Sequence, residues 1–142
     1  MDDVRQAERR DVKYIAHIAR EYEGDDRWSW TPKVVADSLE YFFVEGQPVH
    51  GFVRAQPFGN DLLLTLIAVQ KDARKMGVAT RLLEAMEAVA KAAGLDGVIN
   101  FGPKTPEITH LYTKLGYKEI GIAPEAWGLG SNPILYKEVN NV

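Results

Sequence analysis

The residues between Val69 and Val78 are of types that bind anions. An apolar run ends at Val69, and Arg74, Lys75 and Gly77 precede an apolar repeat that begins at Val78. The first backbone N–H groups of a helix have no partner within the helix, and the helix dipole gives that end partial positive charge. A glycine there lets a ligand approach the backbone closely. An apolar strand, a basic loop and a helix in this order therefore predict a cradle for phosphate.

This segment does not match the common nucleotide-binding motifs. Residues 74–79 follow R-x-x-G-x-A, without the G-K-[ST] of a phosphate-binding loop and without G-x-G-x-x-G. Nucleoside triphosphates and NAD are therefore disfavoured as ligands. Taken alone, the segment is equally compatible with a helix that happens to begin beside a glycine.

Composition and charge limit the classes of protein that this chain can represent. With 142 residues, 46% of them hydrophobic and 26% charged, we expect a single globular domain over residues 1–142. The net charge of −3 argues against a general nucleic-acid-binding protein. Cysteine is absent, which excludes disulfides and thiolate metal sites. Neither a secretory leader nor an apolar run of membrane-span length is visible, so we expect a cytoplasmic protein without membrane association.

Apolar periodicity and turn residues predict a mixed α/β fold built on one sheet. The predicted elements are a short first strand, a helix capped by Asp11, a helix from Thr31 to about Phe42, three strands up to Val69, a helix from Val78 to Gly94, a strand over 96–101, a helix over 105–115, and strands over 117–121 and 133–139. Side-chain caps and proline predict the helix starts, and glycine predicts the stops.

A second motif follows the strand over 96–101. Residues 111–117 read L-Y-T-K-L-G-Y. Together with residues 74–79, this run resembles the two signatures of the GNAT superfamily of acyl-coenzyme A-dependent N-acyltransferases, [QR]-x-x-G-x-[GA] and L-Y-x-K-L-G-[FY]. The order and spacing of the predicted elements resemble the fold of that family over essentially the whole chain.

The resemblance implies a fold and a cofactor. The fold would be a single splayed, mostly antiparallel central sheet flanked by helices, parted between the strand ending at Val69 and the strand over 97–101. Acetyl-CoA would bind where the sheet parts, without a metal. Its pantetheine arm would pair with the backbone of residues 67–69, and its pyrophosphate with N–H groups of residues 76–80. The implied cofactor-binding residues are Ile67, Ala68, Val69, Arg74, Lys75, Met76, Gly77, Val78, Ala79, Thr80 and Thr105, the last standing where many relatives carry an asparagine.

Tyr112 matches the family tyrosine that protonates the departing coenzyme A thiolate. A phenol with a pKa near 10 is a suitable donor to a thiolate of similar basicity. The alternative is a tyrosine that packs on the helix face with its hydroxyl in solvent. Some relatives carry a glutamate base where this chain has Leu63. The general base is therefore open between ordered water, Asp61 and Glu21.

The acceptor site of this family usually lies against the first two helices and the loop between them. Carboxylates and indoles in that region suit a cationic amine, through ion pairing and cation–π contact. The predicted substrate-binding residues are Glu21, Asp25, Asp26, Trp28 and Trp30. A solvated acidic turn whose tryptophans pack on the core is an equally compatible interpretation.

Three classes of function remain for such a chain. The first is an acetyl-CoA-dependent N-acetyltransferase that acts on a small-molecule or peptide amine. The second is a non-catalytic coenzyme A-binding sensor or scaffold with the same fold. The third is a structural protein that uses the fold without a ligand and would not bind coenzyme A. A homodimer is plausible, because dimers are frequent in the family that the chain resembles. Nucleic acid and membranes are not expected partners.

Overall fold

The structure is a computed structural model that describes residues 3–23, 30–101, 106–122 and 133–140. Contacts group the chain into two compact units, Met1–Ala55 with Leu66–Ala85, and Gln56–Thr65 with Met86–Val142. The elements β3 (Gly51–Phe58), β4 (Asp61–Val69) and α3 (Val78–Ala92) contribute residues to both units. The expectation of a single domain over residues 1–142 stays a prediction.

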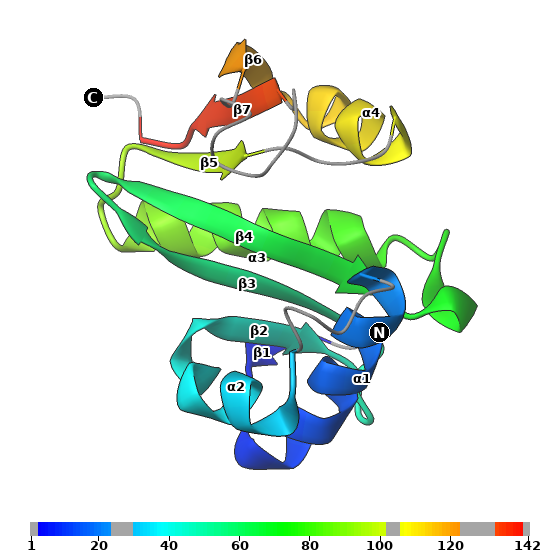
Figure 1. The fold of residues 1–142 in the computed structure, drawn as a ribbon. Helices are drawn as coiled ribbons and strands as arrows, with labels where there is room; N and C mark the ends of the chain where they lie inside the picture. Colours follow the sequence, from blue (N-terminus) through cyan, green and yellow to red (C-terminus); the bar gives the residue numbers. More distant parts are fainter. Residues whose placement is uncertain (1–2, 24–29, 102–105, 123–132, 141–142) are drawn as a thin grey trace. The chain divides into compact units, whose positions relative to one another are not determined.

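The first unit begins with β1 (Val4–Gln6), the short helix η1 (Arg9–Asp11) and α1 (Val12–Glu23). The helix α1 is amphipathic, and its residues Ile15, Ala16 and Ala19 are completely buried. The helix α2 (Pro32–Asp37) lies beside α1 (Figure 1). The short helix η2 (Leu39–Tyr41) leads into β2 (Phe42–Glu45), which pairs antiparallel with β1 and β3.

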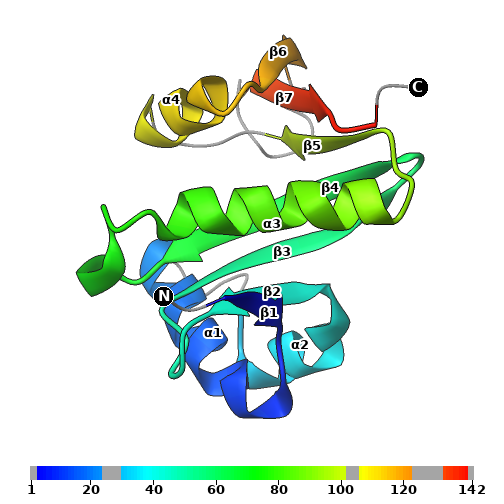
Figure 2. The same ribbon diagram turned by 180° about the vertical axis from the view of Figure 1, so that it is seen from behind.

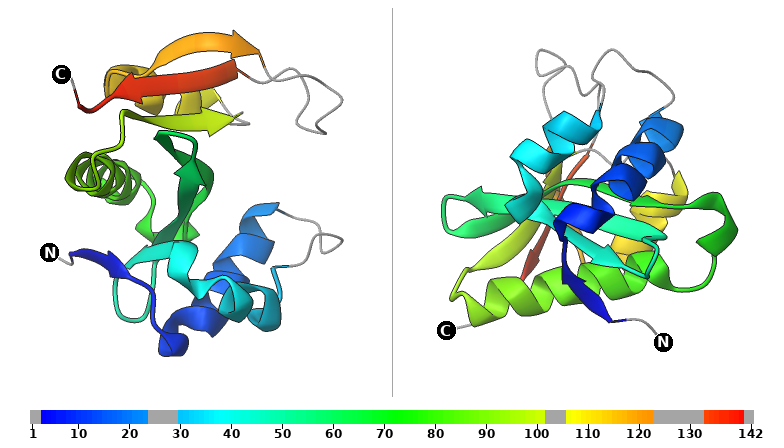
Figure 3. Two further views of the ribbon diagram at one scale, coloured as in Figure 1. Left: turned by 90° about the vertical axis from the view of Figure 1, so that its left-hand side faces the viewer. Right: turned by 90° about the horizontal axis from the view of Figure 1, so that it is seen from below.

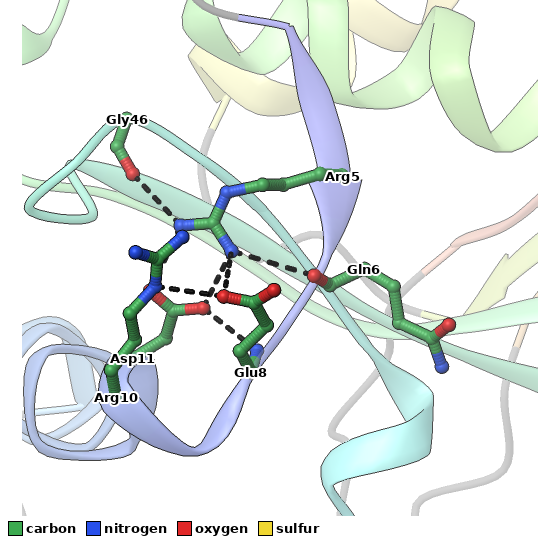
Figure 4. Close-up of polar contacts among 6 residues, drawn as sticks. All are labelled: Arg5, Gln6, Glu8, Arg10, Asp11 and Gly46. Atoms are coloured by element: carbon green, nitrogen blue, oxygen red, sulfur yellow. Dashed lines mark hydrogen bonds and ion pairs between the residues drawn. The ribbon is translucent and has the colours of Figure 1, made fainter.

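Asp11 does not cap α1 as predicted. It lies inside η1, and its carboxylate accepts hydrogen bonds from the Glu8 N–H at 2.7 Å and from two nitrogens of Arg5 at 2.7 and 2.9 Å (Figure 4). A guanidinium binds a carboxylate through two parallel N–H groups, which a single backbone donor of α1 cannot match. The carboxylate is therefore directed back over η1, toward β1.

The second helix is shorter than predicted. Thr31 caps it as expected, because its hydroxyl accepts from the Val34 N–H at 3.2 Å. The α-helix nevertheless ends at Asp37, and Phe42 is already the first residue of β2. The Ser38 hydroxyl donates to the Val34 carbonyl at 3.1 Å, and a serine that competes for helix carbonyl groups favours such an end.

The long helix and the strands before it follow the predicted bounds closely. β4 ends at Val69, the short helix η3 (Lys71–Ala73) lies in the loop, and α3 runs from Val78 to Ala92. Gly94 follows α3 at φ +75°, the conformation in which glycine commonly ends a helix. Gly51 of β3 has no room for a side chain, because a Cβ there would lie 2.6 Å from Val78 Cγ1. β3 and the first turn of α3 therefore pack closely.

The second unit contains β5 (Gly97–Phe101), α4 (Pro106–Lys114), β6 (Lys118–Ile122) and β7 (Pro133–Glu138). β5 and β6 both pair antiparallel with β7, and Figure 3 shows the three strands side by side. Gly116 follows α4 at φ +96°, as its predicted role as a helix stop requires.

Hydrogen bonding joins the strands in the order β1-β2-β3-β4-β5-β7-β6. β4 and β5 pair in parallel from Asp61↔Gly97 to Leu64↔Asn100, although β4 continues to Val69. The mixed α/β class, the mostly antiparallel central sheet and the predicted order of elements are confirmed.

Candidate functional site

The predicted phosphate cradle is a loop of the first unit, between β4 and α3, and Figure 2 shows it at the N-terminal end of α3. Two of its residues have left-handed backbone conformations, Lys75 at φ +66° and Gly77 at φ +79°. This conformation costs a residue with a Cβ on the order of 1 kcal/mol, whereas glycine adopts it freely. The turn into α3 therefore favours glycine at position 77.

The first turn of α3 supplies unpaired backbone donors. The Gly77 carbonyl accepts the first helical hydrogen bond, from the Arg81 N–H at 3.0 Å. The N–H groups of Val78, Ala79 and Thr80 precede it and have no acceptor within the helix. The helix is 15 residues long, so its dipole adds partial positive charge at this end. These features suit an anion such as a pyrophosphate.

The side chains of the loop leave this backbone accessible. Arg74 folds back, and its Nε donates to the Val69 carbonyl at 3.1 Å, so that it closes the loop in addition to adding charge. Lys75 is exposed, and Met76 is 65% exposed. Gly77 is also exposed and presents no side chain. The approach to the N-terminus of α3 is therefore open on the side of the loop.

The residues predicted to meet the pantetheine arm lie at the end of β4. Ile67 and Ala68 have buried side chains, and Val69 is partly buried. The parallel pairing with β5 stops at Leu64, so all three residues lie beyond it. Their backbone is the part of β4 that the predicted ligand would use.

An ion pair that the sequence pattern did not indicate lies beside the loop. Glu45, the last residue of β2, is fully buried and pairs with Arg81 of α3 and with His50. The hydrogen bond from Arg81 holds the pKa of Glu45 below its ordinary value, although burial acts in the opposite direction. A glutamate at the end of the apolar run F-F-V-E was the signal available in the sequence.

Tyr112, the predicted proton donor, belongs to the second unit. It lies on α4, its side chain is completely buried, and its ring packs edge to face on Tyr117 with 4.9 Å between centroids. The hydroxyl of Tyr117 donates to Glu87 at 3.1 Å, and burial together with the Glu87 charge raises the pKa of Tyr117 far above its ordinary value. The ring packing fits the alternative of a tyrosine that packs on the helix face, whereas the complete burial does not fit a hydroxyl in solvent. The catalytic role of Tyr112 stays a prediction.

Asn100 is a second residue that sequence reasoning missed. It is 7% exposed, and its Nδ2 donates to the Leu64 carbonyl at 3.0 Å. That carbonyl can only accept, which fixes the amide orientation. Its Oδ1 has no hydrogen-bond partner in the part of the chain that the structure describes. An acceptor of this kind lies at the end of the parallel pairing between β4 and β5.

Two of the predicted acceptor-site residues can be placed. Glu21 lies on α1, with its Oε2 atom 3.8 Å from Nε2 of His17. Trp30 is partly buried and packs edge to face on Phe42. The remaining predicted residues outside the described ranges are Asp25, Asp26 and Trp28 of the acceptor site and Thr105 of the cofactor site.

The ring of Trp30 is in contact with a cation of the protein itself. The Arg54 guanidinium lies 5.7 Å from the centroid of Trp30 and 5.1 Å from that of Tyr41. Burial lowers the pKa of Arg54 from its ordinary value. Arg54, which no sequence motif singled out, therefore competes with a cationic amine for this indole.

Asp61, one of the open candidates for the general base, lies at the opposite end of β4 from Val69. Its carboxylate accepts a hydrogen bond from the Tyr136 hydroxyl at 2.9 Å. Burial, followed by this hydrogen bond, raises the pKa of Tyr136 to about 12. The position and the partner of Asp61 favour a structural role.

Within the described ranges, no helix is both long and apolar enough to cross a membrane. The same residues contain no group of three or more His, Asp or Glu side chains arranged to bind a metal ion. The cytoplasmic location of the protein and the absence of a metal cofactor stay predictions.

The sequence was compared with models of known protein families, and one family matches. The model of the acetyltransferase (GNAT) domain matches residues 37–119, which is more than half of the chain. The chain therefore belongs to the GNAT acetyltransferase family, and the resemblance seen in its two motifs is confirmed. No curated protein is significantly similar to it in sequence.

Solved structures share the fold over nearly the whole chain. Ard1 from Thermoplasma volcanium has a TM-score of 0.83 and 20% identity, with 99% of each chain covered. The PaiA N-acetyltransferase from Thermoplasma acidophilum, solved in complex with coenzyme A, has a TM-score of 0.82 and 16% identity, covering 97% of this chain and 99% of the other. A GNAT-family acetyltransferase from Bacillus cereus has a TM-score of 0.80 and 19% identity, with 99% of each chain covered. The TM-scores show a common fold, and at identities this low the likeness shows the fold alone.

Proposed function

We propose that this protein transfers the acetyl group of acetyl-CoA to a primary amine. The observation that carries the proposal is the N-terminal end of α3, where Gly77 at φ +79° opens a 15-residue helix whose first N–H groups have no acceptor within it. Membership of the GNAT acetyltransferase family supports it. The coenzyme A bound to a protein of the same fold, PaiA, supports the choice of cofactor.

The residues present fit coenzyme A. In this proposal, its pyrophosphate accepts hydrogen bonds from the N–H groups of Val78, Ala79 and Thr80, and Lys75 adds positive charge nearby. The remaining members of the cofactor set are Ile67, Ala68, Val69, Arg74, Met76 and Gly77, through backbone contacts or loop shape, and Thr105, which lies outside the described residues. Helix N-termini with a reachable backbone bind phosphate groups through their N–H donors and the helix dipole.

The reaction is a direct transfer. The nitrogen lone pair of a neutral amine forms a bond to the acetyl carbonyl carbon, and the carbon–sulfur bond breaks with its electron pair going to sulfur. Tyr112 gives its phenolic proton to the thiolate, and the new amide nitrogen releases one proton, which restores the phenol through solvent. The products are an acetylated amine and coenzyme A. The acceptor in this proposal is a small-molecule or peptide amine.

On the face of β4 where some relatives carry a base, the carboxylate present is that of Asp61 at the start of the strand. The side chains of Leu63, Thr65 and Ile67 also lie on this face, because alternate residues of a strand point to the same side. Because Asp61 is hydrogen-bonded to Tyr136, the amine in this proposal arrives uncharged or loses its proton to water or to Glu21, so the rate is expected to rise with pH up to the pKa of the amine.

Thermal unfolding with and without acetyl-CoA tests the cofactor assignment. At a ligand concentration one hundred times Kd, binding stabilises the folded state by about 2.7 kcal/mol. We expect this increase in the wild type and its loss in Gly77→Glu, because the new side chain would bring bulk and negative charge to the cradle. Gly94→Glu is a matched control, since Gly94 also has a positive φ, +75°, but lies at the other end of α3. Both variants should lose stability, and only Gly94→Glu should keep the ligand response.

Thiol release tests the transfer itself. Free coenzyme A should appear when acetyl-CoA and a panel of amines are supplied. Stabilisation by acetyl-CoA without thiol release from any amine would favour the second function, a coenzyme A-binding sensor or scaffold. An unchanged unfolding temperature in folded wild type would reject both. The homodimer and the cytoplasmic location stay predictions.

A further inference from the structure

The carboxylate of Glu45 is the most deeply buried charge beside the cradle. Its side chain is 1% exposed, and it accepts hydrogen bonds from Arg81 Nε at 2.5 Å, Arg81 Nη2 at 3.0 Å and His50 Nε2 at 2.7 Å. A buried carboxylate is stable only with such partners. Glu45 therefore fixes the guanidinium of Arg81 in one orientation.

Arg81 connects that carboxylate to the loop. It lies on the first turn of α3, and its third nitrogen, Nη1, donates to the Met76 carbonyl at 2.9 Å. The guanidinium also lies over the next residue, since a Cβ on Gly77 would be 3.0 Å from Nη1. One planar group thus joins the end of β2 to the residue before Gly77. We call Glu45, Arg81 and the Met76 carbonyl the brace.

The brace sets the direction of the donors in the cradle. In a trans peptide the C=O and the N–H point in opposite directions. Because the Met76 carbonyl points to Arg81, the N–H of Gly77 in the same peptide points away from Arg81. The Gly77 carbonyl points to the Arg81 N–H at 3.0 Å, so the N–H of Val78 points out of the helix end. Two successive donors are oriented by contacts to one residue.

We infer that the Glu45–Arg81 pair is a positioning device for the pyrophosphate of coenzyme A, acting through the Met76 carbonyl on the N–H group of Gly77. The inference rests on the proposed function. Three of the five N–H groups of the Arg81 guanidinium donate within the protein, and the positioning role requires no contact between Arg81 and the ligand.

A direct contact between Arg81 and phosphate predicts the opposite response to one substitution. If Arg81 bound the phosphate, Glu45→Gln would remove a competing negative charge and tighten the binding of coenzyme A. In the positioning role, Glu45→Gln loosens the guanidinium, lets the Met76 peptide rotate and weakens binding. The sign of the change in Kd therefore separates the two roles.

The experiment compares coenzyme A with pantetheine, which lacks the pyrophosphate and the nucleotide. Kd is measured by calorimetry for the wild type, Glu45→Gln, Arg81→Lys and Asp11→Asn. Arg81→Lys keeps a cation beside Glu45 but cannot reach both carboxylate oxygens and the Met76 carbonyl, and it serves if Glu45→Gln does not fold. Asp11→Asn is the matched control, because Asp11 is also a buried carboxylate of the first unit paired with an arginine.

We expect Kd for coenzyme A to rise about tenfold in both brace variants, as loss of a hydrogen bond to a charged group implies. Kd for pantetheine should stay unchanged, and Asp11→Asn should bind both ligands like the wild type. Tighter binding of coenzyme A by Glu45→Gln, or equal weakening of both ligands, would overturn the inference. A wild type that binds neither ligand would instead reject the proposed function.

Discussion

The Nδ2 atom of Asn100 lies 3.0 Å from the backbone oxygen of Leu64, across the last pair of the parallel ladder between β4 and β5. The other atom of the same amide, Oδ1, is a buried acceptor without a hydrogen-bond partner among the described residues. A buried polar atom left in this state costs about 1–3 kcal/mol. The end of this ladder is therefore a place where a bound water or ligand with an N–H or O–H group gains a hydrogen bond.

Asn100→Asp tests the orientation of this amide. An ionised carboxylate cannot donate to the Leu64 carbonyl, so we expect the free energy of unfolding at pH 7 to fall by about 2 kcal/mol. The protonated acid can donate, so the pKa of the new carboxyl should rise on folding. A raised pKa gives stability that is present below the unfolded value of about 3.9 and lost as pH rises. Urea unfolding between pH 4 and 8 should therefore show the gap to the wild type narrowing toward pH 4.

Asn140→Asp is the control for that measurement. Nδ2 of Asn140 also donates to a backbone carbonyl, that of Leu95 at 2.7 Å, but this contact is only partly buried. We expect a smaller loss of stability and a weaker dependence on pH. Equal and pH-independent losses in the two variants would contradict the assigned role of Asn100.

Tyr112→Phe tests the proposed proton donor. The substitution keeps the edge-to-face ring packing on Tyr117 and removes only the hydroxyl. Loss of a general acid lowers kcat by about 100-fold or more, whereas KM for acetyl-CoA should change little. Thiol release with any active amine gives both constants. Tyr117→Phe removes a neighbouring hydroxyl that is bonded to Glu87, and it should retain kcat. If both variants lost kcat equally, the assignment to Tyr112 would be wrong.

The ion pair of Asp11 and Arg5 predicts a loss of stability in acid. Burial alone would raise the pKa of Asp11, but hydrogen bonds from Arg5 and the Glu8 N–H, with the positive charges nearby, leave it below its ordinary value. A lowered pKa gives stability that is present above the unfolded value and lost as pH falls through the folded value. We expect Asp11→Asn to be less stable at pH 7 by about 2 kcal/mol and to show a shallower decline toward pH 3.

Denaturant unfolding at a series of pH values from 7 to 3 measures this effect. Asp37→Asn is the control, because Asp37 pairs with Lys33 at 2.8 Å on the exposed surface. Its unfolding profile should follow that of the wild type. A parallel acid decline in Asp11→Asn and the wild type would show that Asp11 does not carry the effect.

Tyr117 predicts a loss of stability in alkali. Burial and the Glu87 charge raise its pKa, so the phenol stays protonated in the folded protein after it would ionise in the unfolded chain, at about pH 10. A raised pKa gives stability that is present below the unfolded value and lost as pH rises above it. We expect Tyr117→Phe to lose about 1 kcal/mol at pH 7, from the hydrogen bond to Glu87, and to decline less between pH 9 and 11. Urea unfolding at each pH measures the loss of stability and its decline. If stability fell between pH 9 and 11 as steeply in Tyr117→Phe as in the wild type, Tyr117 would not be the source of the alkaline decline.

The order of elements could be predicted because its signals are local. Gly77, Gly94 and Gly116 all have positive φ and mark the ends of helices, where glycine alone is free of strain. The alternation of apolar residues separates strands from helices without knowledge of their partners. The prediction was wrong at Asp11, whose carboxylate is bound by the Arg5 guanidinium, and at the end of α2, where the Ser38 hydroxyl competes for a helix carbonyl.

The sequence by itself determined the family, the class of the fold and the loop before α3, since each depends on residues that are close together in the chain. Only the tertiary structure decided which side chains meet. Arg81 and Glu45 are 36 positions apart, and so are Asn100 and Leu64. The Arg54 guanidinium likewise lies over aromatic rings contributed by other elements. Such contacts depend on which strands become neighbours and in what register. The burial that strengthens each contact arises only when the sheet and its helices have packed.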